Sequence, residues 1–461
     1  MASKLFGTSG IRGGITSKVT TELALDLGRA LGTFLNGEGT IGVGTDARTS
    51  KDILKNAFIA GTVSTGTNII DLGDAPMPTV ASHSSMDGIT GSVVITASHN
   101  PPTDNGFKFF VSGREYIRSE EIFLEDRVSD KKFKVAEWRD IGTVSNWAIR
   151  ETYLKMVKDF VISRGGRSDG IRVLVDSANG AACNYTPSIL NDLGFAVTTV
   201  NSHPDGHFPG RPAEPSPKNL GDTMKMIAES DFAVALCHDG DGDRLAVIDE
   251  NGQFIDQNRV IALFARDEVL RRGEGTVVVS IDTSSVIDEV VKEAGGTVVR
   301  APLGSLQESF VTQKDENIIF ASEPWKPIFM ELGQWMDGIT GAVRFAQMVQ
   351  ETGEGSCIKL MQTVPEYPIL RENVPCPDSI KPKFLPKVKE LLVPEITGVE
   401  QILEDDGIRI ECTDASYVLV RVSGTEPKAR LYVGAKTQTS LERIADIARK
   451  VMKQVLDELH G

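Results

Sequence analysis

Short apolar runs alternate with segments whose apolar residues recur at helical spacing along most of the chain. An apolar run at 40–44 precedes a helical pattern over 50–64, and further apolar runs follow at 68–72 and 92–95. Strands that alternate with helices predict mixed or mostly parallel sheets with helices packed on both faces.

This order of strand and helix patterns occurs three times. The second unit runs from an apolar stretch at 170–176 to one at 232–236, and the third from 276–282 to 317–320. Sequence identity among the units is slight, so only the pattern repeats. We therefore predict an α/β protein with three domains of similar pattern and mixed sheets, at residues 1–152, 153–253 and 254–368.

The pattern changes after residue 368. Five prolines, Pro375, Pro377, Pro382, Pro386 and Pro394, predict a linker and an irregular entry. Strand patterns then follow at 407–411, 417–422 and 429–435, and a helical pattern covers 440–460. We predict a smaller α+β domain at residues 369–461.

Composition excludes several classes of protein. At 461 residues the chain is too long for one core, and its 40% apolar and 25% charged residues are typical of soluble globular proteins. The net charge of −15 argues against nucleic acid or an anionic membrane as a partner. The five cysteines lack paired spacing, and the chain has neither a signal-peptide core nor a membrane-length apolar run. We expect a cytoplasmic monomer or homodimer with a small anionic ligand.

The stretch at 96–102, Thr-Ala-Ser-His-Asn-Pro-Pro, directly follows the apolar run at 92–95. Two prolines forbid helix and favour extended backbone, which predicts that Ser98 lies on a stiff loop at a strand end. Neighbours in an extended segment point to opposite sides, so His99 is badly placed to act as a base for Ser98. A serine that only caps a loop is the alternative.

Three carboxylates, Asp239, Asp241 and Asp243, alternate with glycines in the loop 238–244. They repel one another unless a cation lies between them, and all-oxygen ligation suits Mg²⁺ or Ca²⁺. An EF-hand needs glycine where Arg244 stands, and a haloacid-type phosphatase needs Thr or Val where Asp243 stands. A purely structural turn is the remaining alternative.

Three further segments carry candidate chemistry. A glycine-rich segment at 5–14 contains Arg12 and suits anion binding, although it could be a plain turn. Lys108 stands between two phenylalanines, where burial could lower its pKa enough to accept a proton, unless it is a solvated strand residue. The third segment, at 421–430, combines cations, hydroxyl groups and a glycine. It predicts an oxyanion site made of Arg421, Ser423, Gly424, Thr425 and Arg430.

The serine loop, the Asn-Gly-x-Lys segment at 105–108, the aspartate loop and the segment 421–427 closely resemble the motifs of the α-D-phosphohexomutases, in the family's order. The resemblance implies four domains around a central cleft and a phosphorylated Ser98 that exchanges its phosphoryl group with a hexose phosphate. It also implies that Ser98 and the three aspartates bind Mg²⁺, and that Arg12 and Arg244 hold the phosphoryl group with His99 beside it. Lys108 is then a candidate general base.

The third unit departs from the family, which commonly has Gly-Glu-x-Ser-Gly where this chain has Ser322-Glu323-Pro324-Trp325-Lys326. The resemblance implies that Glu323 orients the sugar and that the 421–430 loop holds the phosphate that is not transferred. Trp325 could stack on a sugar face or be a packing anchor.

Segments 4–8 and 104–110 resemble the phosphoglucosamine mutases most. We therefore expect interconversion of glucosamine 6-phosphate and glucosamine 1-phosphate, with a hexose 1,6-bisphosphate as intermediate and activator. Phosphomannomutase or phosphoglucomutase activity is the first alternative. A metal-dependent sugar phosphatase would release free phosphate, and a catalytically silent sugar-phosphate binding protein is disfavoured because Ser98 and all three aspartates are present.

Overall fold

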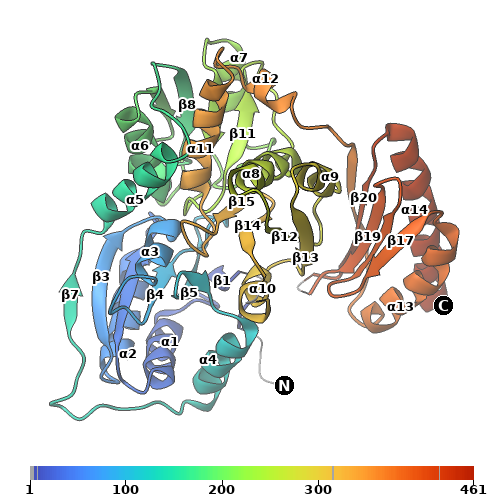
Figure 1. The fold of residues 1–461 in the computed structure, drawn as a ribbon. Coiled ribbons are helices and arrows are strands. Elements are labelled where there is room, and N and C mark those ends of the chain that lie inside the picture. The colour runs from blue at the N-terminus through green and yellow to red at the C-terminus, as the bar shows by residue number, and fades with distance from the viewer. Residues whose placement is uncertain (1–4, 8, 314–315, 425, 461) are drawn as a thin grey trace. The chain divides into compact units, whose positions relative to one another are not determined.

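The computed structural model describes residues 5–7, 9–313, 316–424 and 426–460 (Figure 1). Contacts group the chain into two compact units. The first unit comprises Met1–Gln257, Gln307–Lys314 and Phe320–Gln362. The second comprises Asn258–Leu306, Asp315–Ile319 and Thr363–Gly461.

The N-terminal sheet has the strand order β1-β5-β4-β2-β3-β7, with β6 beside β5. Its β2, β3, β4 and β7 run parallel to one another, whereas β5 runs antiparallel to β4. The elements are β1 (Ile11–Gly14), α1 (Thr21–Phe34), β2 (Thr40–Thr45), α2 (Lys51–Val63), β3 (Asn68–Asp74), α3 (Met77–His83), β4 (Gly91–Ile95), β5 (Asp104–Val111), β6 (Arg114–Glu115), α4 (Arg118–Asp130) and β7 (Val144–Asn146).

The alternation along β2 explains how helices cover both faces of this sheet. Ile41 and Val43 point into the core that includes residues of α1, α2 and α4. On the opposite face, a Cβ atom at Gly42 would lie 2.3 Å from the His83 ring, and one at Gly44 would lie 2.4 Å from Val80. The two glycines therefore allow α3 to pack directly on the sheet.

The second sheet has the order β11-β10-β8-β9. Strand β8 runs parallel to both of its neighbours, β9 and β10, whereas β11 runs antiparallel to β10. Cys237 at the end of β10 pairs with Asp176 at the end of β8. The loops that follow the two strands therefore leave the same edge of the sheet. The elements are α5 (Arg150–Ile162), β8 (Arg172–Asp176), η1 (Ala181–Asn184), α6 (Thr186–Asp192), β9 (Ala196–Val200), α7 (Gly221–Ala228), β10 (Val234–Cys237) and β11 (Ala246–Asp249).

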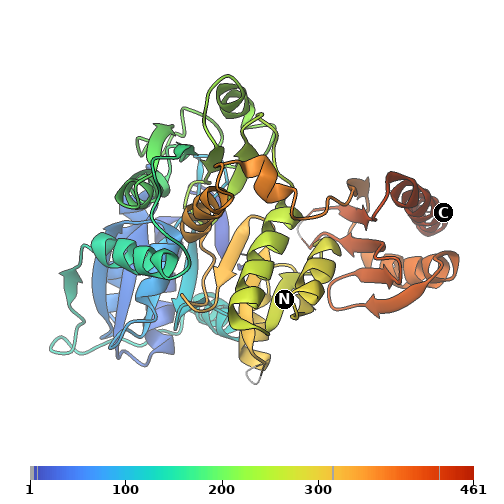
Figure 2. The same ribbon diagram turned by 45° about the horizontal axis from the view of Figure 1, so that its top comes forward.

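The third sheet has the order β13-β12-β14-β15, and the boundary between the two units passes through β14. Strands β12 and β13 are parallel, and β15 returns antiparallel to β14. The helices α8 and α9 lie next to each other (Figures 1 and 2). The elements are α8 (Gln257–Arg272), β12 (Thr276–Ser280), α9 (Val286–Glu293), β13 (Thr297–Ala301), α10 (Leu306–Thr312), β14 (Ile318–Glu323), β15 (Lys326–Phe329), α11 (Gly338–Glu351) and α12 (Cys357–Met361).

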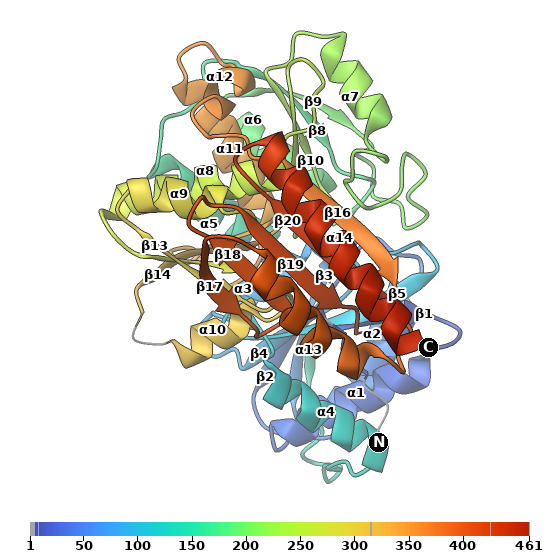
Figure 3. The same ribbon diagram turned by 90° about the vertical axis from the view of Figure 1, so that its right-hand side faces the viewer.

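The fourth sheet has the strand order β16-β20-β19-β18-β17, and each strand runs antiparallel to its neighbours. Helices α13 and α14 cover one face of it (Figure 3), and both contribute to its apolar core. The elements are β16 (Ile369–Pro375), α13 (Lys381–Leu392), η2 (Val393–Glu395), β17 (Val399–Leu403), β18 (Ile408–Cys412), β19 (Tyr417–Val422), β20 (Lys428–Gly434) and α14 (Gln438–His460).

The prediction of an irregular linker after residue 368 is wrong, because this segment forms β16 and α13. Pro375 is the last residue of β16, an edge strand, where a missing N–H costs little. Pro382 lies in the first turn of α13, where the N–H has no partner inside the helix in any case. Pro386 does lie inside the helix, and burial of Phe384 and Val388 in the core stabilises the helix around it.

The predicted fold class is confirmed: three α/β domains with mixed sheets are followed by a smaller α+β domain. Each of the first three sheets combines parallel strands with an antiparallel neighbour. The central cleft stays a prediction. Within the described part of the chain, no helix is both long enough and apolar enough to cross a membrane.

Candidate active site

Ser98 is buried in the turn that follows β4, and its backbone is left-handed (φ 51°). The predicted extended conformation is therefore wrong at this residue. Because of the turn, His99 does not point away from its neighbour, and its Nδ1 lies 3.3 Å from Ser98 Oγ. The serine hydroxyl donates a hydrogen bond to Asp239 Oδ2 at 2.6 Å.

The side chain of Arg48 holds this turn by hydrogen bonds to main-chain carbonyls of the serine loop. The side chain is fully buried and its Nε donates to Asp46 Oδ2 at 3.1 Å. Its two terminal nitrogens donate to four carbonyls of the serine loop, those of Ser98 (2.9 Å), Asn100 (2.7 Å), Pro101 (2.5 Å) and Asp104 (2.8 Å). A left-handed backbone costs a non-glycine residue about 1–2 kcal/mol. The four hydrogen bonds explain how the loop keeps this conformation.

Sequence reasoning missed Asp46 and Arg48 as site residues. The available signal was the Asp46-Ala47-Arg48 loop that follows β2. Since β2 is parallel to β4, both strands end at the same edge of the sheet, and the loop after β2 meets the serine loop there.

Thr96 links the serine loop to the aspartate loop. Its hydroxyl oxygen accepts a hydrogen bond from the Ser98 N–H at 2.8 Å. The same hydroxyl lies 2.7 Å from Asp46 Oδ2 and 3.2 Å from Asp241 Oδ2. It has one proton to donate, so it can bond to only one of these carboxylates at a time.

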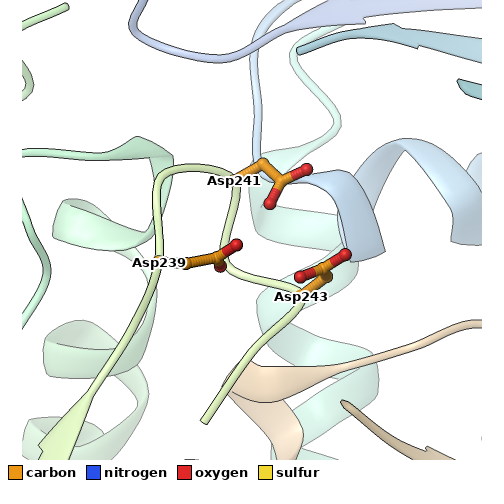
Figure 4. A group of neighbouring side chains, drawn as sticks. All are labelled: Asp239, Asp241 and Asp243. Carbon is orange, nitrogen blue, oxygen red and sulfur yellow. The ribbon is translucent and has the colours of Figure 1, made fainter. Parts of the chain in front are cut away.

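The loop after β10 brings Asp239, Asp241 and Asp243 together. One oxygen from each carboxylate lies within 4.8 Å of the others, and Figure 4 shows the three groups around a shared space. A Cβ atom at Gly240 would lie 2.5 Å from the Ser98 carbonyl oxygen, so only glycine allows the two loops to approach so closely.

The three aspartates fit a divalent cation. Among the described residues, Asp241 Oδ1 and Asp243 Oδ1 are buried without any hydrogen-bond partner. Burial and the neighbouring carboxylates of Asp243 and Asp241 raise the pKa of Asp239 well above its usual range. A small ion that takes oxygen ligands, such as Mg²⁺ or Ca²⁺, would satisfy the free oxygens and relieve this repulsion.

Lys108 on β5 is fully buried, and its Nζ lies 3.1 Å from Asp241 Oδ2 and 2.7 Å from Asp243 Oδ2. Burial lowers the pKa of Lys108, but the carboxylates of Asp241 and Asp243 raise it more, so the net shift is upward. The predicted lowering of this pKa is therefore wrong. Lys108 is a charged partner of the aspartates in this structure, and its role as a general base stays a prediction.

Arg244 follows the aspartates and faces them. Its Nε lies 3.9 Å from Asp239 Oδ2 and 4.0 Å from Asp243 Oδ1. Within the described chain, Arg244 Nε and Nη1 are buried and make no hydrogen bond. These donors suit an anion bound beside Ser98, which is the position predicted for the phosphoryl group.

His99 lies among cations. Burial and the positive charges of Arg244, Arg12 and Lys326 together lower its pKa to about 2. Arg12 itself lies on β1 and not in an open glycine loop, and its Nη2 donates to Ser9 Oγ at 3.0 Å. The imidazole is therefore neutral.

Glu323 and Lys326 face each other across the hairpin of β14 and β15. Both side chains are buried, and Lys326 Nζ lies 3.5 Å from Glu323 Oε2. Trp325 occupies the turn with a left-handed backbone (φ 72°) and packs against the apolar core of the second sheet. The guanidinium of Arg244 lies 5.2 Å from the centre of its ring. These are the contacts of a packing residue.

The predicted oxyanion loop lies in the other unit. Arg421 on β19 pairs with Arg430 on β20, so the two cations are neighbours. Ser423 Oγ accepts a hydrogen bond from the Glu426 N–H at 3.1 Å, and Gly424 is exposed. The Arg421 guanidinium contacts Asp406. Thr425, also predicted for this loop, lies outside the described residues.

Four family models match the chain in consecutive segments. They are described as phosphoglucomutase/phosphomannomutase domain I at residues 3–135, domain II at 151–252, domain III at 256–367 and the C-terminal domain at 372–451. Together the four models span nearly the whole sequence.

Full-length relatives agree with these models. A phosphopentomutase of Thermococcus kodakarensis is 40% identical over 457 residues, which cover 99% of each chain. A probable phosphoglucosamine mutase of Methanopyrus kandleri is 36% identical over 460 residues, again 99% of each chain. The solved structure of a phosphoglucomutase/phosphomannomutase family protein of Burkholderia thailandensis has a TM-score of 0.87 at 24% identity, covering 99% of this chain and 98% of that one.

Proposed function

The chain belongs to the phosphoglucomutase/phosphomannomutase family of α-D-phosphohexomutases, and on this basis we propose that it transfers a phosphoryl group between two oxygens of a sugar phosphate through a phosphorylated Ser98. One observation carries the proposal. The buried Ser98 hydroxyl lies 2.6 Å from Asp239, beside a group of three carboxylates that fits a divalent metal ion.

The reaction has two half-reactions. In the first, the bond from Ser98 Oγ to phosphorus breaks while a sugar hydroxyl bonds to the phosphorus, and the proton that the sugar loses returns to the serine. The resulting sugar bisphosphate then donates its other phosphoryl group to Ser98 by the reverse exchange. A sugar bisphosphate is therefore both the intermediate and the activator of unphosphorylated protein.

Mg²⁺ held by Asp239, Asp241, Asp243 and a phosphoserine oxygen would neutralise charge on the transferring group. Arg244 and Arg12 add positive charge at the same place, with the His99 ring against the serine oxygen. We assign binding of the phosphate that is not transferred to Arg421, Ser423, Gly424, Thr425 and Arg430. This division of roles uses four domains, with boundaries after residues 152, 253 and 368.

Glucosamine phosphate remains the first candidate substrate. The support is the resemblance of segment 104–110 to phosphoglucosamine mutases and the relatives of that name. Glu323, buried at the end of β14, would hold a sugar hydroxyl.

A pentose phosphate is the second candidate. The relative from Thermococcus kodakarensis is named a phosphopentomutase, and the β14–β15 hairpin carries Trp325 and Lys326 where the family commonly has serine and glycine. Lys326 lies beside Glu323, where a glycine would leave more room, which favours a smaller sugar.

The test is an assay of the 6-phosphates of glucosamine, glucose and mannose and of ribose 5-phosphate, with Mg²⁺ and the matching sugar bisphosphate. Production of the 1-phosphate together with phosphoserine at residue 98, detected by mass spectrometry, would support the proposal. Steady release of inorganic phosphate without a 1-phosphate product would instead indicate a phosphatase. Cytoplasmic location and a monomeric or homodimeric state stay predictions.

A further inference from the structure

Lys326 is a buried cation beside the metal-binding loop whose position the mechanism above does not use. It is the first residue of β15, and only 5% of it is exposed. Its Nζ lies 4.0 Å from Asp243 Oδ2 and 3.5 Å from Glu323 Oε2. The ammonium therefore lies between a carboxylate of the metal site and the one assigned to the sugar.

The contacts of this ammonium are long. A hydrogen bond between an ammonium and a carboxylate is usually about 2.7–2.9 Å, and neither of the two carboxylates recorded near Lys326 Nζ comes that close. For comparison, the Lys108 ammonium lies 2.7 Å from the same Asp243. The Lys326 ammonium therefore makes no close hydrogen bond to either carboxylate. Lys326 thus keeps donors for a group that binds in the same space.

Charge balance indicates the sign of that group. Three cations, Lys108, Arg244 and Lys326, lie within 4.0 Å of the three carboxylates of the metal-binding loop. They already balance those carboxylates before any metal binds. A divalent cation would leave an excess of two positive charges, and a phosphoryl monoester carries about −1.5 to −2 at neutral pH. Once a metal ion is bound, the site therefore returns to neutrality only when the phosphoryl group binds as well.

We propose that Lys326 is a further catalytic residue, whose ammonium contacts the phosphoryl group while it passes between Ser98 and the sugar oxygen. This inference rests on the proposed phosphoryl transfer. The phosphorus–oxygen bonds exchange as described above, and the lysine donates hydrogen bonds to a non-bridging phosphoryl oxygen without giving up a proton.

The geometry of the hairpin explains how Lys326 is held there. Pro324 and Trp325 connect β14 to β15, and the left-handed backbone of Trp325 allows the two-residue turn. A tryptophan in this conformation is strained. The Gln257 amide is oriented so that its nitrogen donates to the Leu245 carbonyl oxygen. Its oxygen then accepts a hydrogen bond from Trp325 Nε1 at 3.0 Å. The strained turn is thus anchored, and the next side chain is aimed at the aspartates.

The experiment measures binding of inorganic phosphate next to the metal site. Mn²⁺ replaces Mg²⁺ in the protein, and the ³¹P relaxation of inorganic phosphate reports only anions close to the bound Mn²⁺. We expect Lys326→Met to weaken this binding about tenfold or more, as for the loss of a charged hydrogen bond. Lys326→Arg should restore most of the affinity. In turnover, Lys326→Met should lower kcat and leave the KM for the sugar phosphate nearly unchanged.

Lys55→Met is the matched control, because Lys55 is also a largely buried lysine paired with a carboxylate, Asp71, at 2.9 Å. It should leave phosphate affinity and kcat unchanged. Lys326→Gln, which keeps a polar side chain of similar shape, replaces Lys326→Met if that variant does not fold.

The outcomes distinguish a failure of the role proposed for Lys326 from a failure of the proposed function. Wild-type phosphate affinity and kcat in a folded Lys326→Met or Lys326→Gln variant would overturn the role of Lys326. Equal losses in Lys326→Met and Lys326→Arg, accompanied by a lowered Tm, would make it a structural residue and also overturn the proposal. If wild-type protein lacks mutase activity, the proposed function fails, while phosphate binding near Mn²⁺ still tests the contact made by Lys326.

Discussion

The two regions assigned to phosphate differ in how completely their groups are held before a ligand binds. In the serine–aspartate centre, Ser98, Lys108 and the three aspartates are all nearly or fully buried, and most of their polar atoms are bonded to one another. In the 421–430 loop, Gly424 is exposed and the side chain of Arg430 is 34% exposed. The first region is preorganised, whereas the second is partly exposed and keeps donors without a partner in the described chain, Arg421 Nε and Arg430 Nε.

This difference suits two different tasks. Fixed charges in a buried centre stabilise a transition state strongly, because nearby dipoles need not reorganise and water does not screen them. A partly exposed cation pair contributes less to any single state, but it can bind a phosphate and release it again. We therefore expect changes in the serine–aspartate centre to affect kcat and changes in the 421–430 loop to affect KM.

The largest expected effect is that of Ser98→Ala. The variant loses the phosphoryl acceptor, so kcat should fall by on the order of 10⁴-fold or more, as when a covalent nucleophile is removed. Stability should change little, because the methyl group fits the space of the hydroxymethyl group. Turnover assays and mass spectrometry of the protein after treatment with sugar bisphosphate give the measurement. Wild-type turnover in Ser98→Ala would contradict a phosphoserine mechanism.

Removal of divalent metal should have the next largest effect. Exhaustive chelation should stop turnover, since three carboxylates would then face the phosphoryl group without the ion. The fold should persist, because Lys108 and Arg244 still balance part of the carboxylate charge. Circular dichroism alongside the activity assay distinguishes the two expectations. Full activity with no metal detected by elemental analysis would exclude a metal-dependent reaction.

Arg48→Met tests preorganisation of the serine loop. The change removes the hydrogen bonds to four carbonyls and leaves Asp46 buried without its cation, at a cost of about 3–5 kcal/mol. The matched change in the other region, Arg430→Met, should cost less than about 1 kcal/mol because that ion pair is exposed. Urea denaturation of both variants gives the comparison. Equal losses would show that the two regions are held to the same extent.

The sequence was sufficient to predict the fold class and most strands, because apolar runs and turn residues are local signals. Its failures have physical causes. The prolines of α13 looked incompatible with a helix, yet Pro382 takes a position where it is tolerated and the core stabilises the turn around Pro386. The left-handed backbone of Ser98 depends on Arg48, which is 50 residues earlier in the chain, and a local pattern cannot reveal such a contact.

The candidate site was predictable where one loop carries the chemistry. Asp239, Asp241 and Asp243 are close in sequence, and the structure places them together. The pKa of Lys108 was not predictable, because its partners Asp241 and Asp243 lie in a distant part of the chain, in the loop that follows β10. Partners that come together only on folding decide whether a buried lysine is charged.

Trp325→Ser tests whether the β14–β15 hairpin selects the sugar by stacking. Since Trp325 packs against the apolar core of the second sheet, its loss should destabilise the protein by roughly 3 kcal/mol and depress turnover of all substrates alike. Glu323→Ala is the companion variant, and it should cost on the order of 2 kcal/mol in kcat/KM with little change in Tm. A changed ranking of glucosamine, glucose, mannose and ribose phosphates in Trp325→Ser, at unchanged Tm, would instead assign the ring to the sugar.

Arg421→Gln is expected to have the smallest effect, and it tests the exposed side of the comparison. The guanidinium contacts Asp406, and its Nε is buried without a hydrogen-bond partner in the described chain, so one donor remains for a phosphate. Loss of that donor should raise KM for the sugar phosphate about tenfold and leave kcat nearly unchanged. The reason is that the phosphate that is not transferred is held equally in the ground state and in the transition state. Asp406→Asn is the control, because it removes the ion pair but keeps the arginine. If Arg421→Gln lowered kcat and left KM unchanged, the loop would act in the transition state, and the distinction between a preorganised centre and a surface binding loop would be wrong.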